Sequence, residues 1–294
     1  MLLSEAGQVD RIWPEKFHLD AGLACLCRAM VAGTTDYGMC PISMLAEILA
    51  EVSAVQLALL WLGVMAAAIL RAFTGFGFGL AAVPLFSLVM APTQAVVLSS
   101  SLTLTISLLT LKTYWGGYPL KPMLPMLAMA LLGTVLGVLL LGSLSVSQFQ
   151  LLIGISVIAA CLALSRYRPR RRQAGVAVNS ITGLASGVLN GAFAIPGPPV
   201  IIYAMATESE PARSRSLLMT FFLFSAFLAL LSYGAAGFIT AKSPLMFVLA
   251  FPAMYAGDKL GYYLFRRFGT GLYRRVALVV LLAIGLAITV KSLI

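Results

Sequence analysis

The chain has 294 residues, of which 61% are hydrophobic and only 10% are charged. Soluble domains are about 45–50% apolar and about 25% charged, so this composition excludes an ordinary water-soluble fold and predicts a surface that faces lipid. The net charge of +10 does not indicate a nucleic-acid partner, because the basic residues form short clusters between apolar stretches.

The N-terminal part differs from the rest of the chain. Residues 1–51 contain seven acidic and three basic residues, whereas residues 52–294 contain three acidic and seventeen basic ones. No basic segment is followed there by an apolar run and a small-residue cleavage site, so a signal peptide is not predicted. Two interpretations are left: residues 1–50 form a poorly ordered extension, or translation begins at Met39 or Met44.

Beyond this extension, apolar stretches of about 20 residues recur, the length with which a helix crosses a ~30 Å hydrocarbon core. They lack the alternating pattern of a membrane β-barrel, so we predict an all-α integral membrane protein with eight to ten transmembrane helices. The ten segments are expected at about 52–70, 73–91, 93–111, 121–142, 145–165, 174–192, 195–207, 215–239, 243–265 and 274–293.

The segments also predict an internal repeat. Gly79 and Gly197 lie at equivalent places 118 residues apart, Pro92 and Pro211 follow at an offset of 119, and a Gly-x-x-x-Gly pattern at 133–137 matches one at 257–261. These matches define two halves, residues 52–165 and 174–294, joined by the arginine-rich linker 166–173. Chance matching of glycines, which are frequent in membrane helices, is the alternative.

Five segments are an odd number, so the second half is expected to run through the membrane in the opposite direction. With both ends of the membrane domain outside, 14 basic residues fall in cytoplasmic loops, and only Lys242 and Lys291 flank spans outside. This distribution satisfies the positive-inside rule and supports two inverted-topology repeats.

The second, sixth and seventh segments are interrupted by glycine and proline. Such breaks are tolerated at membrane depth only where the freed backbone groups are buried in protein or line a wet cavity, and paired breaks are typical of a transporter's central site. A helix that begins there offers N–H groups and a partial positive charge to an anion. The candidate substrate-binding residues are therefore Gly75, Gly77, Gly79, Ser100, Asn190, Gly191 and Gly197.

These residues also have ordinary structural explanations. The glycines can serve close helix packing, and hydroxyl groups near Ser100 can bond to their own helix backbone or to a neighbouring helix. Asp258 is the acidic residue inside an apolar segment, and it is either an ion-coupling group or a structural partner of Lys259 or nearby arginines. The scarcity of buried carboxylates favours an anionic over a cationic substrate.

Two motifs carry a family resemblance. Gly75-Phe-Gly-Phe-Gly-Leu-Ala-Ala-Val-Pro84 and Gly187-Val-Leu-Asn-Gly-Ala-Phe-Ala-Ile-Pro-Gly-Pro-Pro199 resemble the TauE/SafE family of membrane transporters over about residues 50–294. The resemblance implies a bacterial inner-membrane carrier of sulfite, sulfonates or related organosulfur anions. The chain departs from the family at Ala192 and Ile195-Pro196, where glycines are common.

Two other classes of function were weighed. A membrane-embedded enzyme acting on a lipid-linked substrate would need a positioned acid, base, nucleophile or metal, and the apolar segments contain no histidine and no Gly-x-Ser-x-Gly motif. An accessory or scaffold protein without transport of its own is the other alternative. No phosphate-binding Gly-x-x-x-x-Gly-Lys motif is present, and no metal or cofactor is expected. The oligomeric state is not predicted by any of these features.

Overall fold

A computed structural model describes residues 54–74, 77–166, 175–208, 210–268 and 270–293 of the chain. The extension 1–50 and most of the linker 166–173 lie outside the described residues. Within the described ranges all regular structure is helical, which confirms the predicted all-α class.

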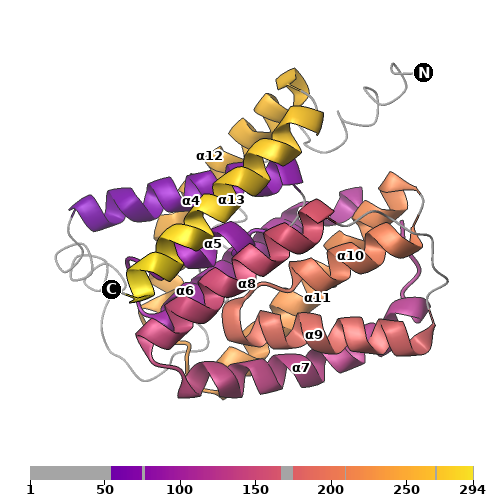
Figure 1. Ribbon diagram of the computed structural model, residues 1–294, viewed down its shortest axis with the longest axis horizontal. Coiled ribbons are helices and arrows are strands. Elements are labelled where there is room, and N and C mark those ends of the chain that lie inside the picture. Colours follow the sequence, from indigo (N-terminus) through magenta and orange to yellow (C-terminus); the bar gives the residue numbers. More distant parts are fainter. Residues whose placement is uncertain (1–53, 75–76, 167–174, 209, 269, 294) are drawn as a thin grey trace.

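Ten α-helices follow one another in the described part of the chain (Figure 1). They are α4 (Ala54–Thr74), α5 (Gly79–Phe86), α6 (Pro92–Leu109), α7 (Leu124–Ser143), α8 (Val146–Arg166), α9 (Val176–Phe193), α10 (Gly197–Thr207), α11 (Pro211–Ala235), α12 (Ser243–Phe268) and α13 (Thr270–Leu293). Five helical stretches are long and apolar enough to cross a membrane: Pro92–Leu109, Lys121–Ser143, Val146–Arg166, Val176–Phe193 and Ala212–Ala235. The number of membrane crossings beyond these five stays a prediction.

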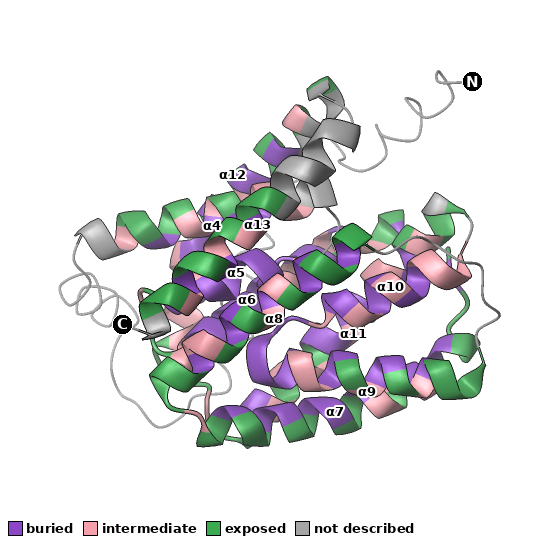
Figure 2. Ribbon diagram, viewed as in Figure 1, coloured by how far each residue is buried: buried purple, intermediate pink, exposed green. Residues whose placement is uncertain are grey.

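The outer surface of α7 consists of large apolar residues, and its inner surface includes several small ones. Leu131, Val135 and Leu139 are exposed, whereas Gly133 and Gly137 are buried against the rest of the protein. Figure 2 shows the exposed positions along the outer side of this helix. Exposed leucine and valine rows would be unfavourable in water, but hydrocarbon chains are a matching solvent for them.

The helices pack in pairs that are distant in sequence. α7 lies along α9, α4 along α12, α8 along α13, and α6 along α11. Figure 1 shows α7 and α9 side by side along one edge of the molecule, with α4, α12 and α13 on the opposite side of α5 and α6. The two short helices, α5 and α10, lie between these outer pairs.

Glycines bring α7 and α9 into backbone contact. A Cβ atom added at Gly187 would lie 2.9 Å from both the Cα and the carbonyl carbon of Ala130, and one at Gly137 would lie 2.9 Å from the Cα of Gly191. Both distances are too short for a real side chain. Small residues that let helix backbones approach are the usual means by which membrane helices associate, because lipid provides no hydrophobic driving force.

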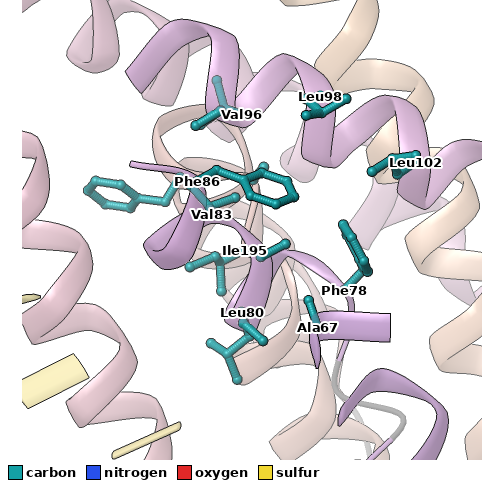
Figure 3. Close-up of a cluster of buried hydrophobic side chains, with 14 of the residues drawn as sticks. Ala67, Phe78, Leu80, Val83, Phe86, Val96, Leu98, Leu102 and Ile195 are labelled. Carbon is teal, nitrogen blue, oxygen red and sulfur yellow. The ribbon is translucent and has the colours of Figure 1, made fainter. Parts of the chain in front are cut away.

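The two interrupted segments form short helices instead of full-length ones. α5 has 8 residues and α10 has 11, which gives lengths of about 12 Å and 16 Å, well short of a ~30 Å hydrocarbon core. Seven of the eight residues of α5 are buried. Figure 3 shows Leu80, Val83 and Phe86 of this helix in a cluster with Val96 from α6 and Ile195 from the second interruption.

Candidate functional site

The two helix interruptions lie in direct contact. A Cβ atom added at Gly79, the first residue of α5, would collide with the carbonyl oxygen of Ala194 and lie 3.1 Å from its carbonyl carbon. Ala194 is the residue that ends α9, two residues before Pro196. The contact requires glycine at position 79, because no other residue lacks a Cβ atom.

A left-handed residue produces the sharp end of α9. Ala194 has φ 52° and ψ 35°, and it is the one non-glycine residue with positive φ among the described residues. Its N–H donates to Asn190 O at 2.8 Å, and Ile195 N–H donates to Leu189 O at 3.2 Å. This pattern terminates a helix within one residue, but alanine in the left-handed region is strained by about 1–2 kcal/mol.

The predicted pairing of the two breaks agrees with where the short helices begin. α5 starts at Gly79 and α10 starts at Gly197, which is buried. The first turn of any helix has N–H groups with no partner inside the helix. In α10 two of these donors are missing, because Pro198 and Pro199 have no N–H. The first turn of α5, Gly79-Leu-Ala-Ala, contains no proline; Ala81 and Ala82 N–H donate to Phe78 O at 3.3 and 3.1 Å.

Gly77 lies at the entrance to α5. It adopts φ 91°, a conformation that favours glycine, and an added Cβ atom would lie 3.7 Å from the ring of Phe222 on α11. Gly75, the other glycine predicted in this break, lies outside the described residues.

Among the clustered hydroxyl groups of α6, Ser99 is the one beside the break. Its side chain is fully buried, its Oγ atom has no hydrogen-bond partner, and that atom lies 3.4 Å from the position of a Cβ atom on Gly79. Ser100, the residue predicted to bind substrate, lies within hydrogen-bonding reach of the buried Tyr233 phenol. Ser101 and Thr103 donate to backbone carbonyls four residues earlier, as serine and threonine in membrane helices commonly do.

Asn190 on α9 forms polar contacts with both α7 and α11. Its Nδ2 donates to Ser225 O on α11 at 2.8 Å and lies 3.4 Å from Thr134 Oγ1 on α7. The Tyr233 hydroxyl donates to Asn190 O at 2.9 Å and lies 3.1 Å from the Gly191 carbonyl oxygen. Gly191 itself faces the backbone of α7 at Thr134. In this conformation both residues serve helix packing, the structural alternative considered for the glycines.

Asp258 pairs with an arginine from the other half of the chain. Arg71 Nη1 lies 2.8 Å from Asp258 Oδ1, and the two side chains are only 13% and 10% exposed. Lys259, the neighbour considered as a partner, lies over the Tyr255 ring with Nζ 4.7 Å from its centroid. Arg71 was expected in a loop, but α4 continues to Thr74 and therefore contains it. Sequence reasoning treated Arg71 only as a topology signal and missed this ion pair.

A family model and a curated relative are similar to this chain. The model of the family described as "Sulfite exporter TauE/SafE" matches residues 59–288 of the chain. A curated relative, the "Probable sulfite/organosulfonate exporter TauE" of Cupriavidus necator, is 27% identical over 163 residues. This match covers 54% of the present chain and 64% of the relative, so it spans less than two thirds of the relative's length. No solved structure matches the chain.

Proposed function

Since the chain belongs to the TauE/SafE family of sulfite exporters, we propose that it carries a small sulfur-containing anion, such as sulfite or an organosulfonate, across the bacterial inner membrane. The observation that carries this proposal is the contact of the two helix interruptions at Gly79 and Ala194. This contact brings the start of α5 and the end of α9 together in the protein interior, where a transporter binds its substrate.

The chemistry around Gly79 suits an anion. The first turn of α5 supplies N–H groups and a partial positive charge, and the unpartnered hydroxyl of Ser99 lies beside it. A buried hydroxyl without a partner is costly, and an oxyanion would satisfy it as an acceptor. We therefore place the substrate's oxygens at Gly77, Gly79 and Ser99, with Gly197 on the opposite side of the contact.

The helix contacts support two inverted repeats. Exchanging the halves relates α4 to α9, α5 to α10, α6 to α11, α7 to α12 and α8 to α13. Under this exchange the α7–α9 contact becomes α12–α4, and α11–α7 becomes α6–α12; both members of each pair are present. The contacts α6–α11 and α8–α13 map onto themselves, as contacts at a two-fold axis must.

Contacts of single residues support the repeat as well. A Cβ atom on Gly133 would meet Leu184 O on α9, and one on Gly257 would meet Met65 O on α4. Gly133 and Gly257 are 124 residues apart, and Met65 and Leu184 are 119 apart, close to the offsets that the sequence motifs predict. Two inverted halves around a central site are the basis of alternating access, in which one half moves against the other.

Anion flux in proteoliposomes tests the proposal. Wild-type protein is expected to release preloaded sulfite or sulfoacetate, in preference to acetate, down a substrate gradient. Gly79→Ala is expected to lower the flux at least tenfold, because the new Cβ atom collides with Ala194 O and separates the two breaks. Gly63→Ala is the matched control, since its Cβ atom would lie 3.6 Å from Leu85 Cβ, an ordinary contact.

A second pair of variants examines the hydroxyl group. Ser99→Ala is expected to weaken sulfite transport about tenfold or more, because a hydrogen bond to a charged group contributes about 1.5–3 kcal/mol. Ser101→Ala is expected to transport normally, because its hydroxyl donates to Val97 O within the same helix. If folded wild-type protein moved none of these anions, transport would be refuted and the accessory or scaffold function favoured.

A further inference from the structure

The Arg71–Asp258 ion pair is largely buried and joins α4 to α12. Asp258 is the one buried acidic residue in the described part of the chain. Besides the 2.8 Å contact with Arg71 from α4, its carboxylate is attracted by Arg215 from α11.

The repeat gives this pair a counterpart in the other half. The offsets that relate Met65 to Leu184 and Gly133 to Gly257 also relate Arg71 to Asn190 and Thr134 to Asp258. Asn190 Nδ2 and Thr134 Oγ1 lie 3.4 Å apart, so the two equivalent positions again face each other. One half therefore has a charged pair where the other half has a neutral one.

The neutral counterpart argues that helix packing does not require the charges. A buried ion pair is expensive to desolvate, and well-packed hydrophobic residues of similar volume can often replace it without loss of stability. Charges inside a membrane are usually retained for function. The ion pair is therefore better explained by a functional role than by helix packing.

Arg71 is carried by the helix that precedes and packs against α5. α4 and α5 pack together, and Gly63 of α4 lies opposite Leu85 near the end of α5. Because α5 turns back along α4, the last turn of α4, which contains Arg71, is level with the beginning of α5. The backbone at Arg71 is thus near the level of Gly77, six residues further along the chain.

We propose that Arg71 is an anion-binding residue, that Asp258 occupies its guanidinium in the empty protein, and that the substrate's oxygens displace this carboxylate during transport. The proposal rests on the proposed function. A guanidinium binds planar or tetrahedral oxyanions through two parallel N–H groups, which suits sulfite and sulfonates. Asp258 is then a competitor that keeps the buried arginine neutralised between transport cycles.

Two variants are expected to change sulfite affinity in opposite directions. Arg71→Asn combined with Asp258→Thr copies the neutral pair of the other half, and it should fold while binding sulfite at least tenfold more weakly. Asp258→Asn removes only the competitor and should bind sulfite more tightly than wild type. Equilibrium binding of radiolabelled sulfite to purified protein in detergent measures both, and thermal unfolding reports whether each variant is folded.

The outcomes separate this inference from the proposed function. A wild-type protein that neither binds nor transports sulfite or sulfoacetate would overturn the function itself. A folded double variant that binds sulfite as wild type does would overturn the role of Arg71 and leave the function standing. Single removal of Asp258 leaves a buried arginine unpaired and can prevent folding. In that case the double variant decides the question alone, because both members of the Arg71–Asp258 pair are removed together.

Discussion

The seam between α7 and α9 allows a quantitative prediction. A Cβ atom at Gly187 would lie 2.9 Å from Ala130 Cα, whereas carbon atoms in favourable contact are about 3.5–4.0 Å apart. The Ala130 carbonyl oxygen would be closer still, so Gly187→Ala requires the helices to separate by roughly 1 Å, a distortion of the kind that costs about 1–3 kcal/mol. Adding Gly191→Ala should cost less than the first substitution, because both residues face the same helix and one separation serves both.

Thermal unfolding of the purified protein in detergent measures this effect. The matched control is Gly142→Ala on α7, where the nearest atom to the new Cβ would be Phe238 Cζ at 3.5 Å. Alanine is favoured over glycine by about 1 kcal/mol in a helix interior, and Gly142, next to the end of α7, gains less of it than Gly187, so helix propensity alone would favour Gly187→Ala. We expect Gly187→Ala to unfold at a clearly lower temperature than Gly142→Ala. Equal stability of the two variants would refute the close approach of α7 and α9.

Two further predictions concern the end of α9 and the topology. Ala194→Gly should raise the free energy of unfolding by about 1 kcal/mol, because glycine adopts the left-handed conformation at φ 52° without strain; an unchanged or lower unfolding temperature would contradict this conformation. In a cysteine-free background, Lys242→Cys should react with a membrane-impermeant maleimide on intact cells, whereas Lys112→Cys should react only after the cells are opened. Labelling of both positions from the same side would contradict two inverted halves.

Local chemistry explains which features could be predicted from the sequence. Apolar composition and stretch length indicate membrane helices, because the bilayer imposes both. Glycine and proline interrupt helices through their own backbone properties, so the starts of α5 at Gly79 and α10 at Gly197 agree with the motif pairing. The family was recognised from the same two motifs, and the match over residues 59–288 confirms it.

Side-chain partners could not be predicted in this way. Arg71 and Asp258 are 187 residues apart, and only the packing of α4 against α12 brings them together. The serine run 99–101 offers three similar hydroxyl groups, but their surroundings differ: Ser101 bonds to its own helix, Ser100 lies at Tyr233, and Ser99 is left without a partner beside Gly79.

The sequence by itself therefore determined that the protein's surface faces lipid, that the chain is helical, and where the helices break. Each of these features depends on a residue's own chemistry and that of its near neighbours. The tertiary structure alone decided that the two breaks touch at Gly79 and Ala194, that Gly191 serves packing against α7, and that Arg71 binds Asp258. These contacts depend on which helix faces are turned toward each other. That orientation follows from the fit of many small residues along whole helices, a property that no single motif contains.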